Sequence, residues 1–269
     1  MLIDSFRHED VDAFLALAAE ERWICGRWEF AFLLRHFPKG CLVARLDDGP
    51  VAFVTAMKYG SSGWIGNLVV RADQRGRGIG CALMERSLQN LMDAGTRTVW
   101  LTASEKGRPI YERLGFRAID RIGRWFGMGS ATGGDEAGNL SMAGILAADW
   151  AGWGDTRESM IGEVMELGMV LTRDGNFLIC QPGTAGMQLG PWGVTRHETA
   201  SLLLGAACGR AGAGMPLYLD VPESNDDAAR LLRSRGFIER GGSLLMYLGE
   251  RPAYDPCCIY ALASMGSMG

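Results

Sequence analysis

The stretch "RADQRGRGIGCALMERSLQNLM", residues 71–92, joins a glycine-rich segment to a helix-like apolar repeat. Its first ten residues hold three arginines and three glycines, and they follow a predicted strand that ends near Val70. A helix start has unpaired N–H groups and a partial positive charge, so it attracts anions. Glycines let a ligand approach the backbone, and arginines add cations. The pattern is typical of a pyrophosphate site, although a glycine triplet taken alone more often marks a plain turn with solvated arginines.

Two common phosphate-binding loops do not fit this stretch. A Walker loop has Lys and then Ser or Thr after its last glycine, whereas Gly80 precedes Cys81 and Ala82. A dinucleotide-binding loop lies in a parallel βαβ unit. Here the chain before the loop, between residues 41 and 70, alternates apolar residues with glycine turns, which predicts an antiparallel meander.

The rest of the first half fits a unit of helices and strands around this loop. Apolar residues recur at helical spacing before the meander and after the loop, and two short runs follow. We expect helices at 8–23, 28–37 and about 78–94, a strand at 98–104, a short helix at 107–115, and one or two strands between 116 and 125.

The same order of elements restarts after a polar segment. Residues 129–140 are rich in Gly, Ser and Thr and predict a linker between a first domain, 1–128, and a second, 141–269. Gly115–Phe116 and Gly236–Phe237 both close a short predicted helix and lie 121 positions apart. The same shift aligns the long helix, the short strand and the short helix of the two halves. We therefore predict a duplicated unit.

Length and composition bound the class of protein. The 269 residues suit two domains, and 48% hydrophobic with 22% charged residues is typical of a globular protein with a buried core. No run approaches the ~18 apolar residues of a membrane span, and the start "MLIDSFRHED" lacks the apolar part of a secretory signal. A net charge of −4 argues against a general nucleic-acid binder. We expect a cytoplasmic protein with neither membrane nor nucleic acid as a partner.

The cysteines indicate neither a disulfide framework nor a metal site. The seven cysteines form no CxxC pair and no Cys/His ligand spacing. We expect reduced, mostly buried thiols and no bound metal.

Two motifs together resemble the GNAT (Gcn5-related) N-acetyltransferase family. Residues 75–80, "RGRGIG", match its R/Q-x-x-G-x-G/A motif, and residues 107–116, "GRPIYERLGF", look like its "A-x-x-L-Y-E-K-L-G-F" segment. The second half, with "IYALASMG" at 259–266, is similar to the divergent second domain of tandem bacterial members. The resemblance implies an α/β (α+β) fold of two tandem GNAT-like domains, each a mixed, largely antiparallel sheet flanked by helices.

The resemblance also implies that the first domain binds acetyl-CoA as co-substrate. The strand before the loop would bind the pantetheine arm and the acyl carbonyl, although core packing alone also produces an apolar strand end. Backbone N–H groups of the loop would hold the pyrophosphate, with Arg71, Arg75 or Arg77 near the 3′-phosphate. Ser104 stands where the family often has an Asn that contacts the cofactor, with a shorter reach. The implied cofactor-binding residues are Leu68, Val69, Val70, Arg75, Gly76, Arg77, Gly78, Ile79, Gly80, Cys81 and Ser104.

Tyr111 falls where many members place a tyrosine that protonates the departing CoA thiolate. A phenol with a pKa of about 10 suits proton donation to a thiolate, and a plain core tyrosine is the alternative. The family has no fixed position for the base. The candidates by neighbourhood are Glu29, Asn67, Asp73 and Glu105, each more often a solvated side chain than a catalyst.

The second copy departs from this pattern. The shift of 121 positions places His197, Thr199 and Ser201 at the three loop glycines. It places Leu232, which has no proton to donate, at Tyr111. We therefore expect one cofactor site, in the first domain, and a second domain that helps to wall the acceptor pocket. The candidates for that wall, although tryptophan is more often a core residue, are Trp150, Trp153 and Trp192.

The expected activity is transfer of an acetyl group from acetyl-CoA to a primary amine of a small molecule or peptide by direct attack. Leu68–Val70 would polarise the thioester carbonyl, and Tyr111 would protonate the thiolate. One alternative is a non-catalytic protein that binds or senses acyl-CoA. Another is a binder of nucleotide phosphates. The identity of the acceptor and the oligomeric state stay open at this level.

Overall fold

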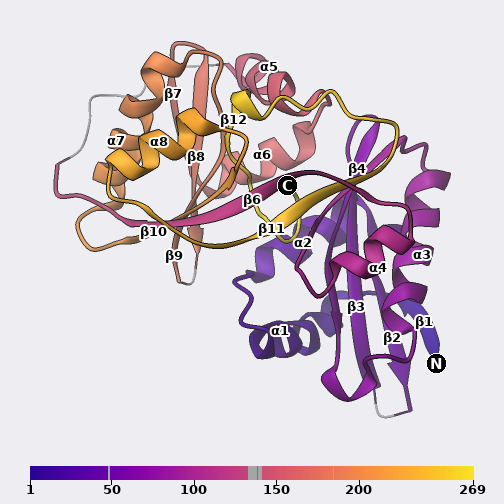
Figure 1. The fold of residues 1–269 in the computed structure, drawn as a ribbon. Coiled ribbons are helices and arrows are strands. Elements are labelled where there is room, and N and C mark those ends of the chain that lie inside the picture. Colours follow the sequence, from indigo (N-terminus) through magenta and orange to yellow (C-terminus); the bar gives the residue numbers. More distant parts are fainter. Residues whose placement is uncertain (48, 133–137, 139–140, 184) are drawn as a thin grey trace.

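One mixed sheet runs through both halves of the chain. The structure is a computed structural model that describes residues 1–269 except 48, 133–137, 139–140 and 184. The strands lie in the order β1-β2-β3-β4-β5-β11-β6-β10-β9-β8-β7, with β12 paired to β9. Helices flank the sheet in each half (Figure 1). The mixed, mostly antiparallel sheet with flanking helices confirms the predicted fold class.

The first half contains the predicted meander and the helix after the glycine loop. Apart from its ends β3 is buried on both faces, which explains why its sequence reads as a nearly continuous apolar run. The elements are β1 (Leu2–Ser5), α1 (Val11–Glu20), α2 (Arg27–His36), β2 (Leu42–Leu46), β3 (Gly49–Lys58), β4 (Ser62–Val70), α3 (Ile79–Asp93), β5 (Thr98–Ala103), α4 (Arg108–Arg113) and β6 (Arg117–Met128).

The second half repeats this order with an added terminal strand. Its elements are α5 (Met142–Trp153), α6 (Glu158–Leu167), β7 (Met169–Arg173), β8 (Asn176–Gly183), β9 (Gly186–Gly193), α7 (Ala200–Ala211), β10 (Pro216–Pro222), α8 (Asp226–Ser234), β11 (Ile238–Gly249) and β12 (Ile259–Ala261). Of the predicted linker, residues 133–137 and 139–140 lie outside the described residues.

The predicted repeat holds where the two motifs are alike. The Phe116 N–H donates to the Tyr111 carbonyl, and the Phe237 N–H donates to the Leu232 carbonyl, both at 3.0 Å. Gly115 and Gly236 precede these phenylalanines, with φ of 91° and 78°. Helices α3 and α7 also begin 121 positions apart, as do β6 and β11.

The two halves exchange their last long strands, which the sequence did not indicate. β11, from the second half, lies between β5 and β6 and pairs antiparallel with both. β6, from the first half, pairs in turn with β10. The two strands cross the middle of the molecule in Figure 1. Each half therefore completes its sheet with a strand of the other.

The last residues of the chain return to the first half. After β12, residues 262–269 form a segment that we call the C-terminal strap. Leu262 and Met268 are fully buried and belong to the same hydrophobic core as Phe30 and Phe53 of the first half. The C-terminus accordingly lies between the halves in Figure 1.

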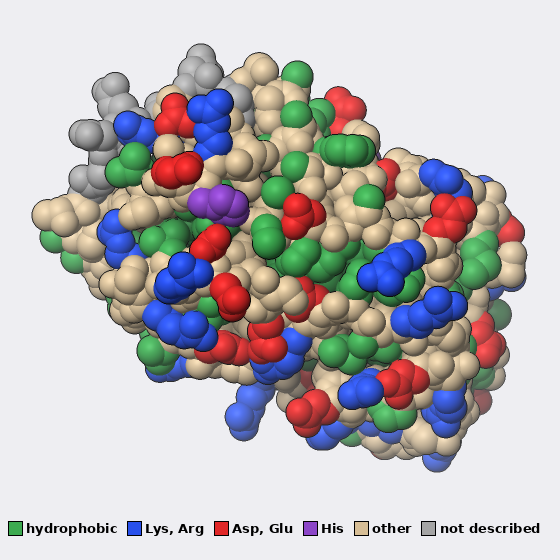
Figure 2. Space-filling view, turned by 45° about the horizontal axis from the view of Figure 1, so that its top comes forward, with side chains coloured by type: hydrophobic (Ala, Val, Ile, Leu, Met, Phe, Trp, Pro, Cys, Tyr) green, Lys and Arg blue, Asp and Glu red, His purple; other side chains and the backbone are tan. Residues whose placement is uncertain are grey.

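Four further observations concern possible partners and the surface of the protein. No helix among the described residues is long and apolar enough to cross a membrane. The same residues contain no group of three or more His, Cys, Asp or Glu side chains that could hold a metal ion. All seven cysteines are free. Basic and acidic side chains are interspersed over the face shown in Figure 2.

Candidate active site

A β-bulge interrupts β4 at the first of the residues implied to bind pantetheine. Asn67 and Leu68 together oppose one residue of β3, Val54. Asn67 has a φ of 55°, and its side-chain amide donates to Thr55 Oγ1 at 3.0 Å. This hydrogen bond fixes a backbone conformation that non-glycine residues rarely adopt.

Strands β4 and β5 separate beyond this bulge. Their parallel pairing runs from Ser62 to Trp64 on β4, and the described residues show no further pairing between the two strands. Beyond the bulge, Val69 and Val70 therefore pair with β3 but not with β5; Val69 is buried, while Leu68 and Val70 are half-buried. The sheet opens at the end of β4 where the glycine loop begins.

The glycine loop adopts the conformation that its sequence predicts. Gly76 and Gly78 have φ of 77° and 79°, and open space surrounds the position of an added Cβ at each. Gly78 is the N-cap of α3, and buried Ile79 anchors the first turn. In the described part of the chain, no backbone acceptor bonds the N–H groups of residues 76–81. These donors are available to a ligand.

The three arginines around the loop differ in their contacts. Arg71 Nε donates to Asp73 Oδ1 at 2.7 Å. Arg75 Nε donates to the Val70 carbonyl at 2.9 Å, and its guanidinium pairs with Glu21. Arg77 is exposed and makes no ion pair with any residue that the structure describes. Arg77 is thus the cation most available to a phosphate.

Ser104 and Tyr111 lie on the chain that follows β5. The Ser104 hydroxyl accepts the Gly107 N–H at 3.2 Å, so it stabilises the turn before α4. Tyr111 lies on α4 with its ring 6.0 Å from that of Phe116, in an edge-on arrangement. Burial raises the pKa of Tyr111 to about 12, which keeps the phenol protonated at neutral pH.

The four candidate bases differ in their exposure to solvent and in their hydrogen bonds. Asp73 and Glu105 are exposed, and the Asn67 amide is used by Thr55. Glu29, expected to be solvated, is instead buried at the first turn of α2. Burial raises its pKa, and hydrogen bonds from the Ser267 hydroxyl and the Gly26 N–H together with the charge of Arg124 offset part of this effect. The expectation of a solvated side chain was wrong for Glu29 and also for Asn67, which is buried as well.

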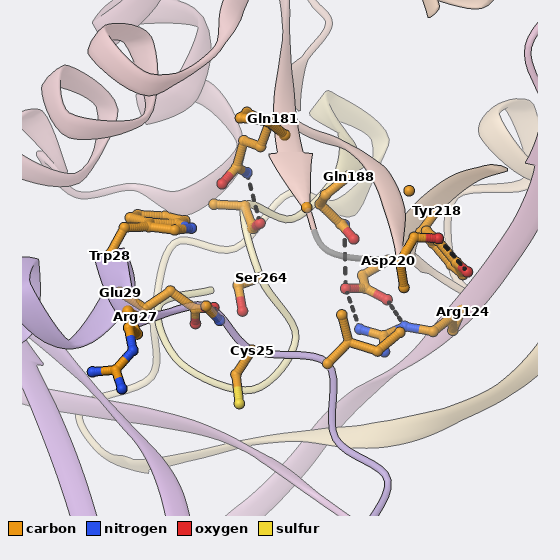
Figure 3. Close-up of a pocket in the computed structure, with 17 residues that line it drawn as sticks. Cys25, Arg27, Trp28, Glu29, Arg124, Gln181, Gln188, Tyr218, Asp220 and Ser264 are labelled. Carbon is orange, nitrogen blue, oxygen red and sulfur yellow. Dashed lines mark hydrogen bonds and ion pairs between the residues drawn. The ribbon is translucent and has the colours of Figure 1, made fainter. Parts of the chain in front are cut away.

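A cavity of about 430 Å³ lies beside Glu29, between the halves. Figure 3 shows Trp28 and Glu29 on one side, and Gln181, Gln188 and Tyr218 of the second half across the cavity. The predicted tryptophan wall was wrong. Trp153 and Trp192 are buried in the core, Trp150 is exposed, and none of the three lines this cavity.

A charged pair closes one end of the cavity. Arg124 of β6 donates through Nε and Nη2 to the two oxygens of Asp220 on β10, at 2.7 and 2.8 Å. Asp220 is fully buried and also accepts the Met265 N–H at 3.1 Å. The guanidinium thus compensates the buried carboxylate through two parallel hydrogen bonds.

The C-terminal strap passes between the separated ends of β4 and β5. The Asn67 N–H donates to the Gly266 carbonyl at 3.2 Å, and Thr102 Oγ1 donates to the Met265 carbonyl at 2.5 Å. Ser267 Oγ donates to Glu29 Oε2 at 2.6 Å. The strap therefore connects both strands with the buried carboxyl group.

The second half contains a similar opening with a different occupant. A bulge in β9 places Gly190 and Pro191 opposite Ile179, as Asn67 and Leu68 lie opposite Val54. Beyond the bulge, Ile259 and Ala261 of β12 pair with Gly193 and Trp192. β12 thus lies against the counterparts of Val69 and Val70.

The connection after this opening also differs from the glycine loop. Residues 197–199 form a 3-10 helix that runs directly into α7. The chain from β9 to α7 is two residues shorter than that from β4 to α3, so the shift of 121 positions fails in the strand before the loop. Bulge alignment pairs Leu68 with Pro191, two positions later than that shift predicts.

Family models for an acetyltransferase (GNAT) domain match residues 38–118 and residues 145–261. The two matches follow one another and include both openings described above. The chain belongs to the GNAT acetyltransferase family. The tandem arrangement predicted from the duplicated motifs is confirmed, and the GNAT domain of the first half contains the glycine loop and Tyr111.

Known relatives of this GNAT protein agree with the assignment. An uncharacterized N-acetyltransferase from Methanocaldococcus jannaschii is 30% identical over 123 residues, 40% of this chain and 52% of that protein. The chain thus matches about half the length of this curated relative. A putative acetyltransferase from Pyrococcus horikoshii superimposes with a TM-score of 0.87 at 22% identity, over 100% of this chain and 95% of that one. A GCN5-related N-acetyltransferase from Sphaerobacter thermophilus superimposes with a TM-score of 0.66 at 16% identity, over 94% of this chain and 97% of that one. Both structures share the fold.

Proposed function

We propose that this GNAT protein transfers an acetyl group from acetyl-CoA to a primary amine. The observation that carries the proposal concerns the described part of the chain: the edge of β4 at residues 68–70 has no β5 partner there, and it leads directly to the N–H groups of residues 76–81, which have no backbone acceptor. An extended pantetheine arm matches a strand edge, and a pyrophosphate matches a helix start preceded by glycines. Acetyl-CoA carries both groups in this order.

The residues around the loop fit the remaining parts of the cofactor. Gly76 and Gly78 leave open space where side chains would block a phosphate. Arg77 supplies a cation to the 3′-phosphate, and Arg75 fixes the loop through the Val70 carbonyl. Acetyl-CoA supplies the activated acyl group as a thioester. Backbone groups of Leu68–Val70 hold its carbonyl oxygen as negative charge develops.

Tyr111 is the proposed acid of the reaction. Attack of the amine nitrogen on the carbonyl carbon forms a C–N bond, and breaking of the C–S bond releases the thiolate of CoA. A protonated phenol donates its proton to that thiolate, and the raised pKa of Tyr111 keeps the phenol in the required form.

A single cofactor site per chain is part of the proposal. β12 pairs with Trp192 and Gly193, the counterparts of Val69 and Val70, so the chain itself covers the strand edge of the second opening. A short 3-10 helix stands at the place of the glycine loop. Both observations support binding in the first half alone.

Calorimetric titration and thiol release test the proposal together. We expect one acetyl-CoA per chain, weaker binding of ATP, and CoA release that depends on an added amine. Two bound molecules per chain contradict the single site. Comparable affinities for ATP and acetyl-CoA favour a binder of nucleotide phosphates. Tight binding of acetyl-CoA without thiol release across a broad amine panel favours the non-catalytic sensor.

A further inference from the structure

The cavity between the halves ends at a carboxyl group that has hydrogen-bond donors but forms no ion pair with any of the residues that the structure describes. Glu29 Oε1 accepts the Gly26 N–H at 2.8 Å, and Oε2 accepts the Ser267 hydroxyl at 2.6 Å. The side chain is 7% exposed and lines the cavity. Each carboxylate oxygen keeps a lone pair for a further donor. A ligand with a hydrogen-bond donor or a positive charge can therefore bind to the Glu29 carboxylate.

The carboxyl group lies close to the place where the thioester is expected. Gly266 and Ser267 are consecutive residues of the strap. The Gly266 carbonyl bonds the Asn67 N–H, and Asn67 directly precedes Leu68, whereas the Ser267 hydroxyl bonds Glu29. Two adjacent residues thus join the carboxyl group to the bulge that ends the cofactor groove.

The charges of the cavity favour an ammonium group at Glu29. Asp220 is compensated by Arg124 through two hydrogen bonds, so the ionised Glu29 leaves one uncompensated negative charge. The other groups of this cavity that titrate or carry charge are Cys25, Arg27, Arg124, Tyr218 and Asp220. Arg27, on the first turn of α2, is exposed and pairs with Asp12, so its charge is compensated outside the cavity. Burial raises the pKa of Cys25 to about 12, so the thiol stays neutral.

We propose that this cavity is the acceptor site, that it binds a small-molecule primary amine with an apolar body, and that Glu29 removes the proton from its ammonium group. The inference rests on the proposed acetyl transfer. A volume of about 430 Å³ suits a small ligand. The walls supply mostly apolar contacts to its body, from Ile24, Trp28, Pro182 and Ala185.

Glu29 and Tyr111 divide the proton transfers of this reaction between them. The ammonium N–H gives its proton to the Glu29 carboxylate, which frees the nitrogen lone pair for attack on the thioester carbonyl carbon. Collapse of the tetrahedral species breaks the C–S bond, and Tyr111 protonates the thiolate. The amide nitrogen loses its second proton through solvent to the Tyr111 phenolate. Glu29 releases the remaining proton to solvent, so one proton is produced per turnover.

Ser267 is a positioning residue in this scheme. Its hydroxyl is buried and donates to Glu29, which favours the ionised carboxylate. The strap of the second half therefore orients and tunes the base of the first half.

The test compares Glu29→Gln with Glu166→Gln, an exposed control on α6. The acceptors are 2-phenylethylamine, which is protonated at pH 7, and phenylhydrazine, which is not. For Glu29→Gln we expect kcat/KM to fall about 10²-fold or more with the first acceptor and by less than about threefold with the second. With 2-phenylethylamine, kcat/KM of Glu29→Gln should rise about tenfold per pH unit as a growing fraction of this amine is deprotonated. Glu166→Gln should keep the kcat/KM of the natural protein with both acceptors, and neither substitution should change the affinity for acetyl-CoA.

The outcomes separate this inference from the proposed function. Absence of acetyl-CoA binding or of any amine-dependent thiol release in the natural protein overturns both. If Glu29→Gln changes kcat/KM by the same factor for both acceptors, the role of Glu29 is overturned and the proposed acetyl transfer is not. Efficient use of amino sugars or polyamines, with phenylethylamine rejected, overturns the apolar acceptor class.

A second variant keeps the carboxyl group and tests its positioning. Ser267→Ala removes a hydrogen bond that lowers the pKa of Glu29. The acid limb of the kcat/KM profile should therefore move to higher pH, while acetyl-CoA affinity stays unchanged. An unmoved limb at full activity contradicts the positioning role.

Discussion

At the scale of single residues, Gly78 combines a backbone requirement with a proposed ligand contact. Gly78 and Gly214 both have φ near 80° and open space at the position of a Cβ. Alanine in this conformation costs about 1–2 kcal/mol of stability at either position. Only Gly78→Ala places a methyl group in the proposed phosphate loop, so it should also weaken acetyl-CoA binding at least tenfold. Urea denaturation and calorimetric titration of both variants check this, and equal acetyl-CoA affinities for the two contradict it.

Tyr111→Phe separates chemistry from binding. The ring keeps its contact with Phe116, so we expect no change in melting temperature or in acetyl-CoA affinity. Loss of the proton donor should lower kcat about 10²-fold. Because the pKa of Tyr111 is about 12, its deprotonation should not contribute to an alkaline limb below pH 10. Steady-state kinetics measured from pH 6 to 10 test both statements, and an unchanged kcat assigns Tyr111 to packing alone.

At the scale of elements, β12 and the strap depend on a glycine in β9. A side chain at Gly190 would meet the Leu262 carbonyl, which is backbone and cannot move aside alone. Gly190→Ala should cost about 1–3 kcal/mol of stability. It should also lower kcat, because the strap continues from Leu262 to the contact with Glu29. Gly205→Ala, on α7 with ordinary contacts, is the control and should be neutral or stabilising. Normal activity of Gly190→Ala would show that the strap tolerates displacement.

Elements with a local signal were predictable from the sequence, and those without one were not. The glycine loop, α3 and the meander follow from glycine positions and apolar periodicity. α5 is apolar on all sides, so it lacks a helical stripe. β1 and β12 are too short for their alternation to be read.

The burial of Glu29 had no local signal either. The Gly26 N–H that bonds one carboxyl oxygen is local, but the Ser267 hydroxyl that bonds the other lies 238 positions away along the chain. The cofactor groove was predictable because one continuous stretch encodes it. The acceptor cavity was not, because segments from both halves build it.

At the scale of the whole molecule, Asp155 links the halves through the turn between β3 and β4. It accepts the N–H groups of Ser61 and Ser62 and the Ser62 hydroxyl at 2.6 Å. Burial raises the pKa of Asp155, but these hydrogen bonds outweigh burial and hold the pKa below its usual value. A carboxyl group whose pKa is lower in the folded than in the unfolded state stabilises the protein at pH values above its unfolded-state pKa. This contribution disappears as the pH falls through the folded-state pKa.

Asp155→Asn should therefore show a pH-dependent loss of stability. At pH 7 we expect it to be about 1–2 kcal/mol less stable than the natural protein, since the side chain is only half-buried. The difference should shrink as the pH falls below 3.8, the usual pKa of an aspartate side chain. Urea denaturation at pH 7 and at pH 3.5 measures both values, with the exposed Asp93→Asn as control. A difference that is the same at both pH values contradicts the role of the charge.

The exchange of β6 and β11 also determines when the molecule can fold during synthesis. The ribosome finishes β5 and β6 long before β11 emerges, yet β11 belongs between them. A nascent chain of the first half therefore exposes two unpaired strand edges, which are aggregation-prone. The strap that contacts Glu29 emerges later still. Premature termination of translation before β11 thus yields a chain with the cofactor loop but without the strand that lies between β5 and β6.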